Sequence, residues 1–202
     1  MQTAENRSVI EDDLAEEERL RMNTYSLLAR LLYAIPDAGL LRRLGQIEAA
    51  PAAANPLERS WQRLKSVAEQ AQAPELDDEF HALFIGVGRG ELVPYGSWYQ
   101  TGFLMDRPLA ALRGDLQRLG IERKQDIREP EDHAAALCES MALLIQSATP
   151  VALQQRFYNA HLGSWLKRFF LDLDTAPSAR FYKAVGQLGA AFMTLEQRYL
   201  GA

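Results

Sequence analysis

Two short segments of this 202-residue chain carry the residue types that could do chemistry. Residues 94–99 read PYGSWY, and residues 129–133 read EPEDH. Tyrosine and tryptophan in an irregular segment either fill a core or form the wall of a groove, because each has an apolar ring and a polar end. In the second segment His133 stands beside carboxylates, which favour its protonated form. Such a cluster could bind a guanidinium, hold a loop or act as a base, and the residue types alone do not choose among these roles.

A catalytic interpretation of these segments is incomplete. Asp132 and His133 could form an acid–base pair, but the pair needs a nucleophile or a metal, and Ser97 is the only candidate nucleophile. The other histidines, His81 and His161, are widely separated in the sequence, which is weak evidence for a metal site. The sequence contains no phosphate-binding loop, nucleophile elbow or dinucleotide fingerprint. We therefore expect a protein without catalytic residues, bound metal or cofactor.

Composition favours a folded protein of the cytoplasm. Apolar residues make up 48% of the chain, and the net charge is -5, with 22 basic residues scattered among 27 acidic ones, which disfavours nucleic-acid binding. The single cysteine, Cys138, excludes an intramolecular disulfide and is expected to pack in the core. The N-terminus is acidic and lacks the apolar stretch of a secretory signal. No apolar run is long enough to span a membrane, so stable membrane insertion is not expected.

Apolar residues recur every three or four positions along most of the chain, which predicts helices from end to end. Residues 86–103 are rich in glycine and aromatic residues and are expected to form a long loop. We predict an all-α, single-domain multi-helix bundle over residues 1–202, of which residues 1–20 form an acidic N-terminal part that could be mobile. The predicted helices are about 10–33, 38–48, one opening at Asn55 and Pro56, one from about Glu75 to a cap at Gly86, about 106–120, one opening at Pro130, one from about Val151 that breaks near Gly163, and one after Ser178.

The two motifs, in this order and at this distance, resemble the TorD/DmsD/NarJ family of redox-enzyme maturation chaperones. The resemblance extends from about Met22 to Tyr199 and includes the segments DEFHALFIG before PYGSWY and AHLGSWLKRFF after EPEDH. It implies an all-helical cytoplasmic protein of the TorD-like type that binds the catalytic subunit of a molybdenum-cofactor oxidoreductase. Many relatives bind the twin-arginine leader of this client and keep the apoenzyme competent for cofactor insertion before export or assembly. The resemblance also implies a monomer or a dimer with exchanged helices.

The resemblance places the client contact between the aromatic segment and the EPEDH segment. Carboxylates can accept charge-assisted hydrogen bonds from the two guanidinium groups of a leader, and an aromatic groove can bury the apolar stretch after them. Weak contact with a guanine nucleotide or with the molybdopterin cofactor has no supporting motif in this chain. The residues carried over are Tyr95, Ser97, Trp98, Tyr99, Glu129, Pro130, Asp132 and His133, with Phe80 and Phe84 as aromatic positions of the same region.

Several alternatives stay open. The chain could be a NarJ-like assembly adaptor that binds an internal segment of a molybdoenzyme that is not exported, or an acid–base enzyme that uses Asp132 and His133. Within the chaperone interpretation, His133 could orient Asp132 or contact the peptide. The acidic residues 11–18 could attract a basic leader or serve only as a solvated helix start.

Overall fold

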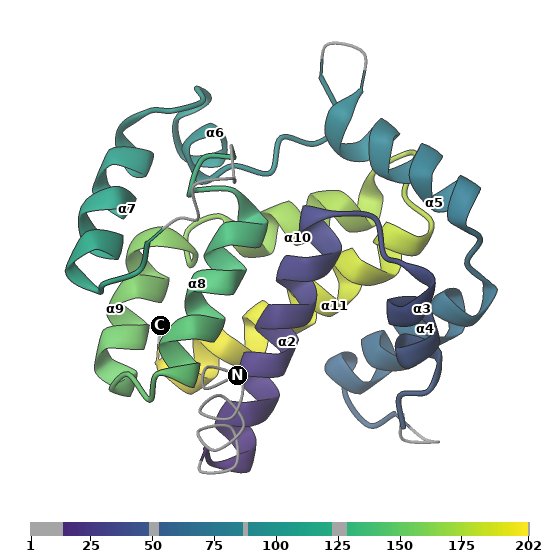
Figure 1. Ribbon diagram of the computed structural model, residues 1–202, viewed down its shortest axis with the longest axis horizontal. Helices are drawn as coiled ribbons and strands as arrows, with labels where there is room; N and C mark the ends of the chain where they lie inside the picture. The colour runs from purple at the N-terminus through teal and green to yellow at the C-terminus, as the bar shows by residue number, and fades with distance from the viewer. Residues whose placement is uncertain (1–13, 49–52, 87–88, 123–128, 202) are drawn as a thin grey trace, which may run out of the picture.

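A computed structural model describes residues 14–48, 53–86, 89–122 and 129–201 (Figure 1). Every regular element in these ranges is helical, so the predicted all-α class is confirmed. In none of these ranges is there a helix both long and apolar enough to cross a membrane. The elements are α2 (Glu16–Tyr33), α3 (Ala38–Gly45), α4 (Pro56–Gln70), α5 (Ala73–Phe80), the π-helix η1 (His81–Ile85), α6 (Gly96–Thr101), α7 (Arg107–Arg118), α8 (Ala134–Gln146), α9 (Val151–His161), α10 (Leu166–Thr175) and α11 (Phe181–Leu200).

The centre of the molecule consists of two helix pairs, α2 with α8 and α10 with α11. Figure 1 shows α7 and α9 on one side of this centre and α3, α4 and α5 on the other. Helix α4 packs on α11, and α3 packs on α4, so the N-terminal elements cover the C-terminal helix. The first and last described helices therefore share one bundle.

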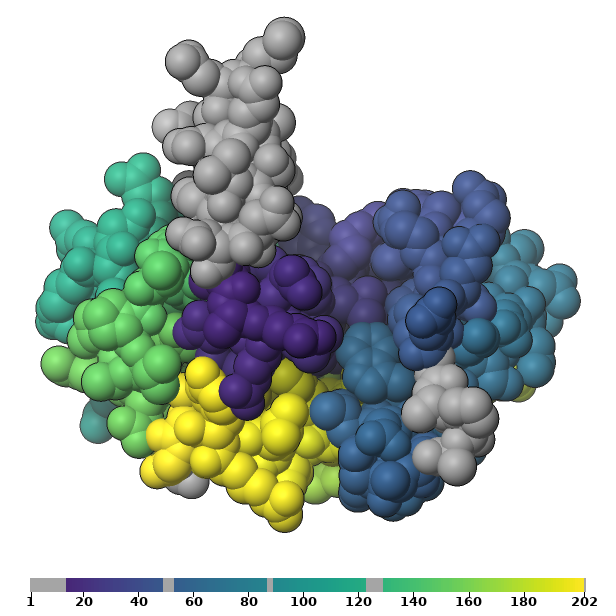
Figure 2. Space-filling model, turned by 90° about the horizontal axis from the view of Figure 1, so that it is seen from below, coloured from purple at the N-terminus to yellow at the C-terminus, as the bar shows by residue number. Residues whose placement is uncertain are grey.

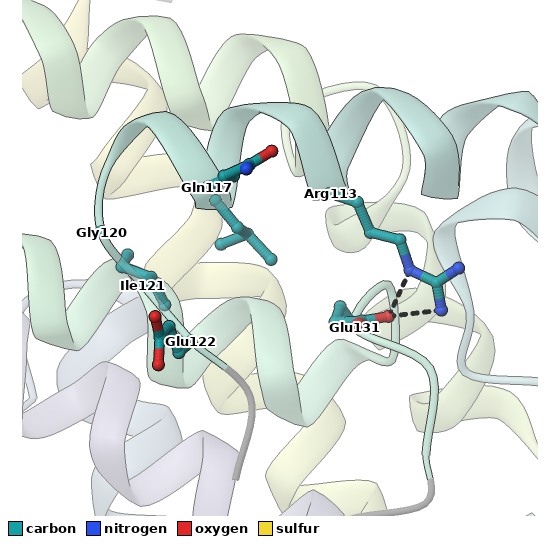
Figure 3. A pocket seen from close by; sticks show the side chains of 7 residues that line it. Arg113, Gln117, Gly120, Ile121, Glu122 and Glu131 are labelled. Carbon is teal, nitrogen blue, oxygen red and sulfur yellow. Dashed lines mark hydrogen bonds and ion pairs between the residues drawn. The ribbon is translucent and has the colours of Figure 1, made fainter. Parts of the chain in front are cut away.

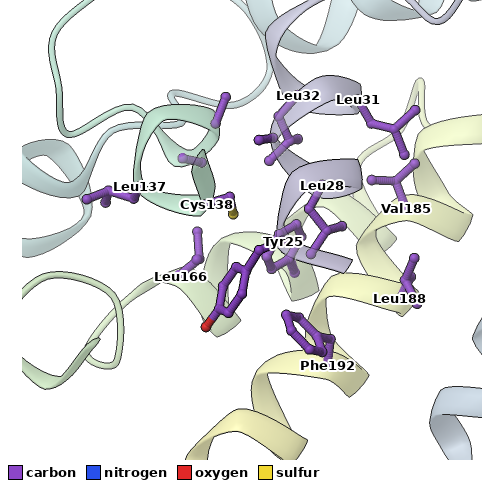
Figure 4. Close-up of a cluster of buried hydrophobic side chains, with 14 of the residues drawn as sticks. Tyr25, Leu28, Leu31, Leu32, Leu137, Cys138, Leu166, Val185, Leu188 and Phe192 are labelled. Carbon is purple, nitrogen blue, oxygen red and sulfur yellow. The ribbon is translucent and has the colours of Figure 1, made fainter. Parts of the chain in front are cut away.

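One contiguous cluster of buried side chains joins these helices. Tyr25 and Leu28 of α2 lie close to Cys138 of α8 and to Leu188 and Phe192 of α11 (Figure 4). The rings of Tyr25 and Phe192 meet edge to face with centroids 4.8 Å apart. Cys138 is fully buried in this cluster, as its sequence context predicts. The apolar periodicity seen in the sequence thus corresponds to the faces that build this core.

A buried ion pair also links the first and last described helices. Arg21 of α2 donates Nε to Glu196 of α11 at 2.6 Å and Nη1 to Gln154 of α9 at 3.0 Å. Both Arg21 and Glu196 are almost fully buried. Figure 2 shows the beginning of α2 lying against the end of α11 on one face of the molecule. Because a buried charge without its partner is costly, this pair fixes which helix α2 meets there.

Glu79 performs a similar long-range task at the other end of α11. Its buried carboxylate accepts hydrogen bonds from the backbone N–H groups of Arg180, Phe181 and Tyr182 at 2.7–3.1 Å. A helix start leaves such N–H groups without partners inside the helix, and a carboxylate there is stabilised by the helix dipole. The side chain of a residue in α5 therefore caps a helix that begins about a hundred positions later.

Most predicted helix ends are confirmed, with four corrections. Asn55 caps α4 and Gly86 ends η1 with a φ of 57°, as predicted. Residues 14–15, predicted to be helical, are not, and α2 begins at Glu16; the predicted start at Ile10 lies outside the described ranges, as does most of the acidic N-terminal part. The second ends at Gly45 instead of Glu48. The predicted 86–103 loop contains α6, and the helix predicted to open at Pro130 begins at Ala134.

Candidate functional site

The two sequence motifs lie side by side and are joined through their backbones. Tyr95 and His133 form an isolated antiparallel bridge. On either side of it, the N–H of Gly96 donates to the carbonyl of Asp132 at 2.9 Å, and the N–H of Ala134 donates to the carbonyl of Pro94 at 2.8 Å. The start of α6 and the start of α8 are thus held together as one unit.

Asp132 strengthens this connection with its side chain. The carboxylate is buried, and Oδ2 accepts a hydrogen bond from the backbone N–H of Ser97 at 2.8 Å. Tyr95, the residue before α6, provides no side-chain cap of its own. Asp132 therefore does for α6 what an N-cap side chain does within a helix. The carboxylate therefore serves the neighbouring helix rather than the helix that follows it in the sequence.

The cap of α8 is His133, whereas the sequence predicted that this helix opens at Pro130. The Nδ1 atom of His133 accepts a hydrogen bond from the backbone N–H of Ala135 at 3.1 Å, and the side chain is buried. Burial lowers the pKa of His133 to about 4, against the opposing effect of Glu129 and Asp132, which raise it. The expected protonated imidazole is therefore wrong, because removal from water outweighs the nearby carboxylates. A neutral ring with an unprotonated Nδ1 is also what the cap requires.

Tyr95 joins the aromatic motif to the first residue of EPEDH. Its hydroxyl donates to the carboxylate of the exposed Glu129, and its ring meets the ring of His133 edge to face at a centroid distance of 5.0 Å. Partial burial and the interaction with Glu129 raise the pKa of Tyr95 above its ordinary value. Tyr95 therefore stays protonated and keeps the Glu129 carboxylate at the surface of the site.

Glu131 points the other way, toward α7. Arg113 donates Nε to Glu131 Oε2 at 2.9 Å, and its Nη2 lies 2.9 Å from the same oxygen (Figure 3). Arg113 is about half exposed, whereas Glu131 is largely covered. These two residues line a shallow pocket together with Leu116, Gln117, Gly120, Ile121 and Glu122. One carboxylate of EPEDH is thus already occupied by a guanidinium of the chain itself.

Trp98 and Tyr99 project from α6 on the far side of the motif and are both half-buried. The hydroxyl of Tyr99 donates to Asp172 of α10 at 2.9 Å, and its ring lies 5.3 Å from that of Trp165. The guanidinium of Arg89 lies 5.3 Å from the centroid of the Trp98 ring, within cation–π distance. This is a second surface of mixed charge: a cleft of about 260 Å³ lined by Arg89, Glu91, Leu92, Val93, Trp98, Tyr99, Arg168 and Asp172.

Phe80 and Phe84 belong to a different aromatic cluster. Their rings pack on Tyr182 of α11, at centroid distances of 5.8 and 5.3 Å. Of the residues proposed from the sequence, the structure thus brings together Tyr95, Ser97, Trp98, Tyr99, Glu129, Pro130, Asp132 and His133, and it places Phe80 and Phe84 beside α11.

Arg113, Arg89 and Arg168 are additions that the sequence did not suggest. An arginine on an amphipathic helix or in a loop is usually a solvated residue, and its partner is visible only in the fold. Within the described ranges, no group of three or more histidine, cysteine, aspartate or glutamate side chains is arranged to hold a metal ion. The contacts that the arrangement offers are charged and aromatic.

Comparison with known proteins decides the family. Residues 50–171, more than half of the chain, match the family described as nitrate reductase delta subunit. The chain belongs to this family. The match confirms the resemblance to the TorD/NarJ group of redox-enzyme maturation chaperones.

Individual relatives agree with this membership. The chaperone protein TorD of Vibrio atlanticus is 28% identical over 180 residues, 83% of each chain. The chaperone protein TorD of Vibrio parahaemolyticus is 26% identical over 205 residues, 96% of this chain and 90% of the relative. A proposed redox enzyme maturation protein from Archaeoglobus fulgidus shares the fold, with a TM-score of 0.56 and 16% identity over 86% of this chain and 93% of that chain.

Proposed function

We propose that this chain is a dedicated maturation chaperone for the catalytic subunit of a molybdenum-cofactor oxidoreductase. In this role it binds the twin-arginine leader and the apo form of the client, and it assists cofactor insertion before export or assembly. Membership in the TorD/NarJ group supports the chaperone role. The observation that supports the leader-binding part is the joining of the PYGSWY and EPEDH segments at Tyr95 and His133, with the exposed Glu129 beside Tyr95.

The proposed residues divide into two sets by accessibility. Tyr95, Trp98, Tyr99, Glu129 and Pro130 are at least partly exposed and are proposed to touch the client. Asp132 and His133 are buried and their side chains accept from backbone N–H groups, so we assign them a positioning role, while Ser97 is buried and contributes its backbone N–H. Phe80 and Phe84 pack on Tyr182 of α11, so we assign them to the core and not to the client contact.

The chemistry suits a basic peptide followed by an apolar one. Glu129 is the accessible carboxylate of the motif and can accept charge-assisted hydrogen bonds from a guanidinium. The half-exposed ring of Trp98 offers apolar area on the same short helix. The acid–base enzyme is a weaker candidate, because Asp132 and His133 both engage backbone N–H groups and the relatives are named chaperones.

Calorimetric titration with twin-arginine leader peptides of candidate molybdoenzymes tests the proposal. We expect micromolar or tighter binding that is lost when both arginines of the peptide are replaced by glutamine. Replacement of Glu129 by Gln should weaken binding about tenfold, the order expected for a charge-assisted hydrogen bond. The change Glu139→Gln on the exposed side of α8 is the matched control and should leave affinity unchanged.

A second candidate follows from the matched family, whose description names a nitrate reductase subunit. In that case the chain is an adaptor that grips the mature part of an enzyme that is not exported. A folded protein that binds no leader, yet forms a complex with the apo catalytic subunit, would replace the first proposal with this one.

A further inference from the structure

Three large apolar side chains in succession stand out into solvent between α6 and α7. Phe103, Leu104 and Met105 are 71%, 51% and 73% exposed. Single exposed apolar residues are ordinary on protein surfaces, but contiguous ones mark interaction sites. We refer to these three residues as the apolar tip.

The backbone of the apolar tip is held in place from both ends. Gly102, with a φ of 81°, ends α6 by donating its N–H to the carbonyl of Trp98 at 2.8 Å. Asp106 begins α7, where its carboxylate accepts from the N–H of Arg107 at 2.7 Å. The hydroxyl of Thr101 accepts from the N–H of Phe103 at 3.3 Å. These hydrogen bonds fix the turn that carries the apolar tip.

Met105 adds backbone strain to this turn. Its φ is 57°, in the left-handed region that residues with a Cβ rarely adopt. Such a conformation at an exposed apolar residue costs free energy and gains no burial within this chain. Strained residues of this kind cluster at functional sites.

The apolar tip lies one short helix away from the acidic motif. Helix α6 has six residues and is therefore about 9 Å long. Its amino end is fixed to Asp132, close to Glu129 and Tyr95, and its carboxyl end leads directly into the tip. The Glu129 carboxylate thus lies near one end of α6, and exposed apolar side chains follow the other end.

We propose that the apolar tip docks the apolar stretch of a client segment whose basic residues are held at Glu129. This inference rests on the proposed function and specifies its ligand. Glu129 lies near the amino end of α6 and the apolar tip follows its carboxyl end, an order that complements a segment that is basic and then apolar. A span of about 9 Å corresponds to about three residues of extended peptide or six of helix. The first apolar anchor of the client therefore lies about three to six residues after its arginines.

A double-mutant cycle tests this assignment. The protein variant is Phe103→Ser with Met105→Ser, and the peptide variant is a leader whose apolar stretch is replaced by serine. We expect the protein variant to weaken binding of the unchanged leader about tenfold, the order for losing one partly buried large apolar side chain. It should have no further effect on the serine-substituted leader, since both changes remove the same contact.

One control and one further variant keep the test specific. Leu171→Ser removes a side chain that is 48% exposed on α10 and should leave affinity unchanged. Met105→Gly relieves the positive φ, so it should weaken binding while the thermal midpoint stays the same or rises. Circular dichroism of each variant establishes that the helices are intact.

The outcomes separate this inference from the function on which it rests. If the unaltered protein shows no arginine-dependent binding, the proposed function fails. If it binds and the serine tip variant binds equally well, the apolar tip assignment fails. It also fails if the tip variants change only binding to lipid vesicles or only the sedimentation of the free protein, since the tip then serves a membrane or a second copy.

Discussion

The carboxylate of Asp132 accepts a hydrogen bond from the backbone N–H of Ser97 at 2.8 Å, across 35 positions of sequence. Through this contact the EPEDH segment caps the helix that carries Trp98 and Tyr99. A change at Asp132 should therefore alter the proposed client site by releasing α6, even though the side chain itself is buried.

Replacing Asp132 by Asn tests this connection. The variant keeps an oxygen acceptor but loses the charge at the start of α6, so we expect the free energy of unfolding to fall by about 1–2 kcal/mol. Leader affinity should fall with it. The control is Ser97→Ala, because the buried Ser97 hydroxyl has no hydrogen-bond partner in the part of the chain that the structure describes. Urea denaturation should find this control within about 0.5 kcal/mol of the unaltered protein, and an equal loss in both variants would refute the capping role.

His133 makes stability depend on pH in a definite direction. Its folded pKa is lowered to about 4, below the ordinary value of 6.5, so the unfolded chain binds its proton first. Stability supported by the neutral ring is present above pH 6.5, falls as the pH drops toward 4, and changes little from this group below that. The contribution is on the order of 3 kcal/mol at most.

Denaturation at pH 7 and pH 5 measures this dependence. In His133→Asn an amide oxygen can still accept from the N–H of Ala135, but the titrating ring is gone. The unaltered protein should lose more stability between the two pH values than this variant. Equal losses would show that His133 does not titrate as the structure indicates.

If the client binds as proposed, Arg113 should compete with it for the EPEDH segment. Its guanidinium engages Glu131, and a leader arginine that reaches this carboxylate has to displace it. An exposed ion pair is worth about 0.2–1 kcal/mol, so Arg113→Ala should tighten leader binding by about 1.5- to 5-fold. Arg118→Ala removes the same charge from the same helix but a different ion pair, with Asp115, and corrects for long-range attraction. Calorimetry that finds equal affinities in the two variants would exclude the competition.

The buried pair of Arg21 and Glu196 should respond asymmetrically to substitution. Arg21→Met leaves a buried carboxylate without its partner and should cost about 3–5 kcal/mol of unfolding free energy. The double change Arg21→Met with Glu196→Leu removes both charges and should recover a large part of that loss. Chemical denaturation of the single and double variants gives the comparison. A double variant no more stable than the single one would mean that packing, rather than the unpaired charge, dominates at this site.

The predicted helix ends succeeded where a cap is made within the helix itself. Asn55 and Pro56 start α4, and Gly120 follows α7 with a φ of 68°, because cap chemistry is local and can be read from adjacent residues. The prediction failed at α8, where Pro130 suggested a helix start and His133 supplies the cap. The sequence-based prediction also missed α6, whose six residues are stabilised by Asp132 from a distant part of the chain.

The candidate site shows the same division. The residues of the two motifs were predicted to lie together, and the structure places them in direct contact. The charge state of His133 was predicted wrongly, because the sequence shows the neighbouring carboxylates and hides the burial that outweighs them. The occupation of Glu131 by Arg113 depends on the packing of α7, which no local pattern specifies.

The cap that Glu79 places on α11 has a consequence for synthesis on the ribosome. The amino end of α11 is capped by the carboxylate of Glu79, which is made about a hundred residues earlier. Helix α4 also packs on α11, so its buried face is covered only when α11 is present. A nascent chain that has been made only as far as α10 therefore has an incomplete core. In that chain the carboxylate of Glu79 lacks the N–H donors that it has in the folded protein. Native structure in this protein should consequently appear late, after α11 has left the exit tunnel, and all at once.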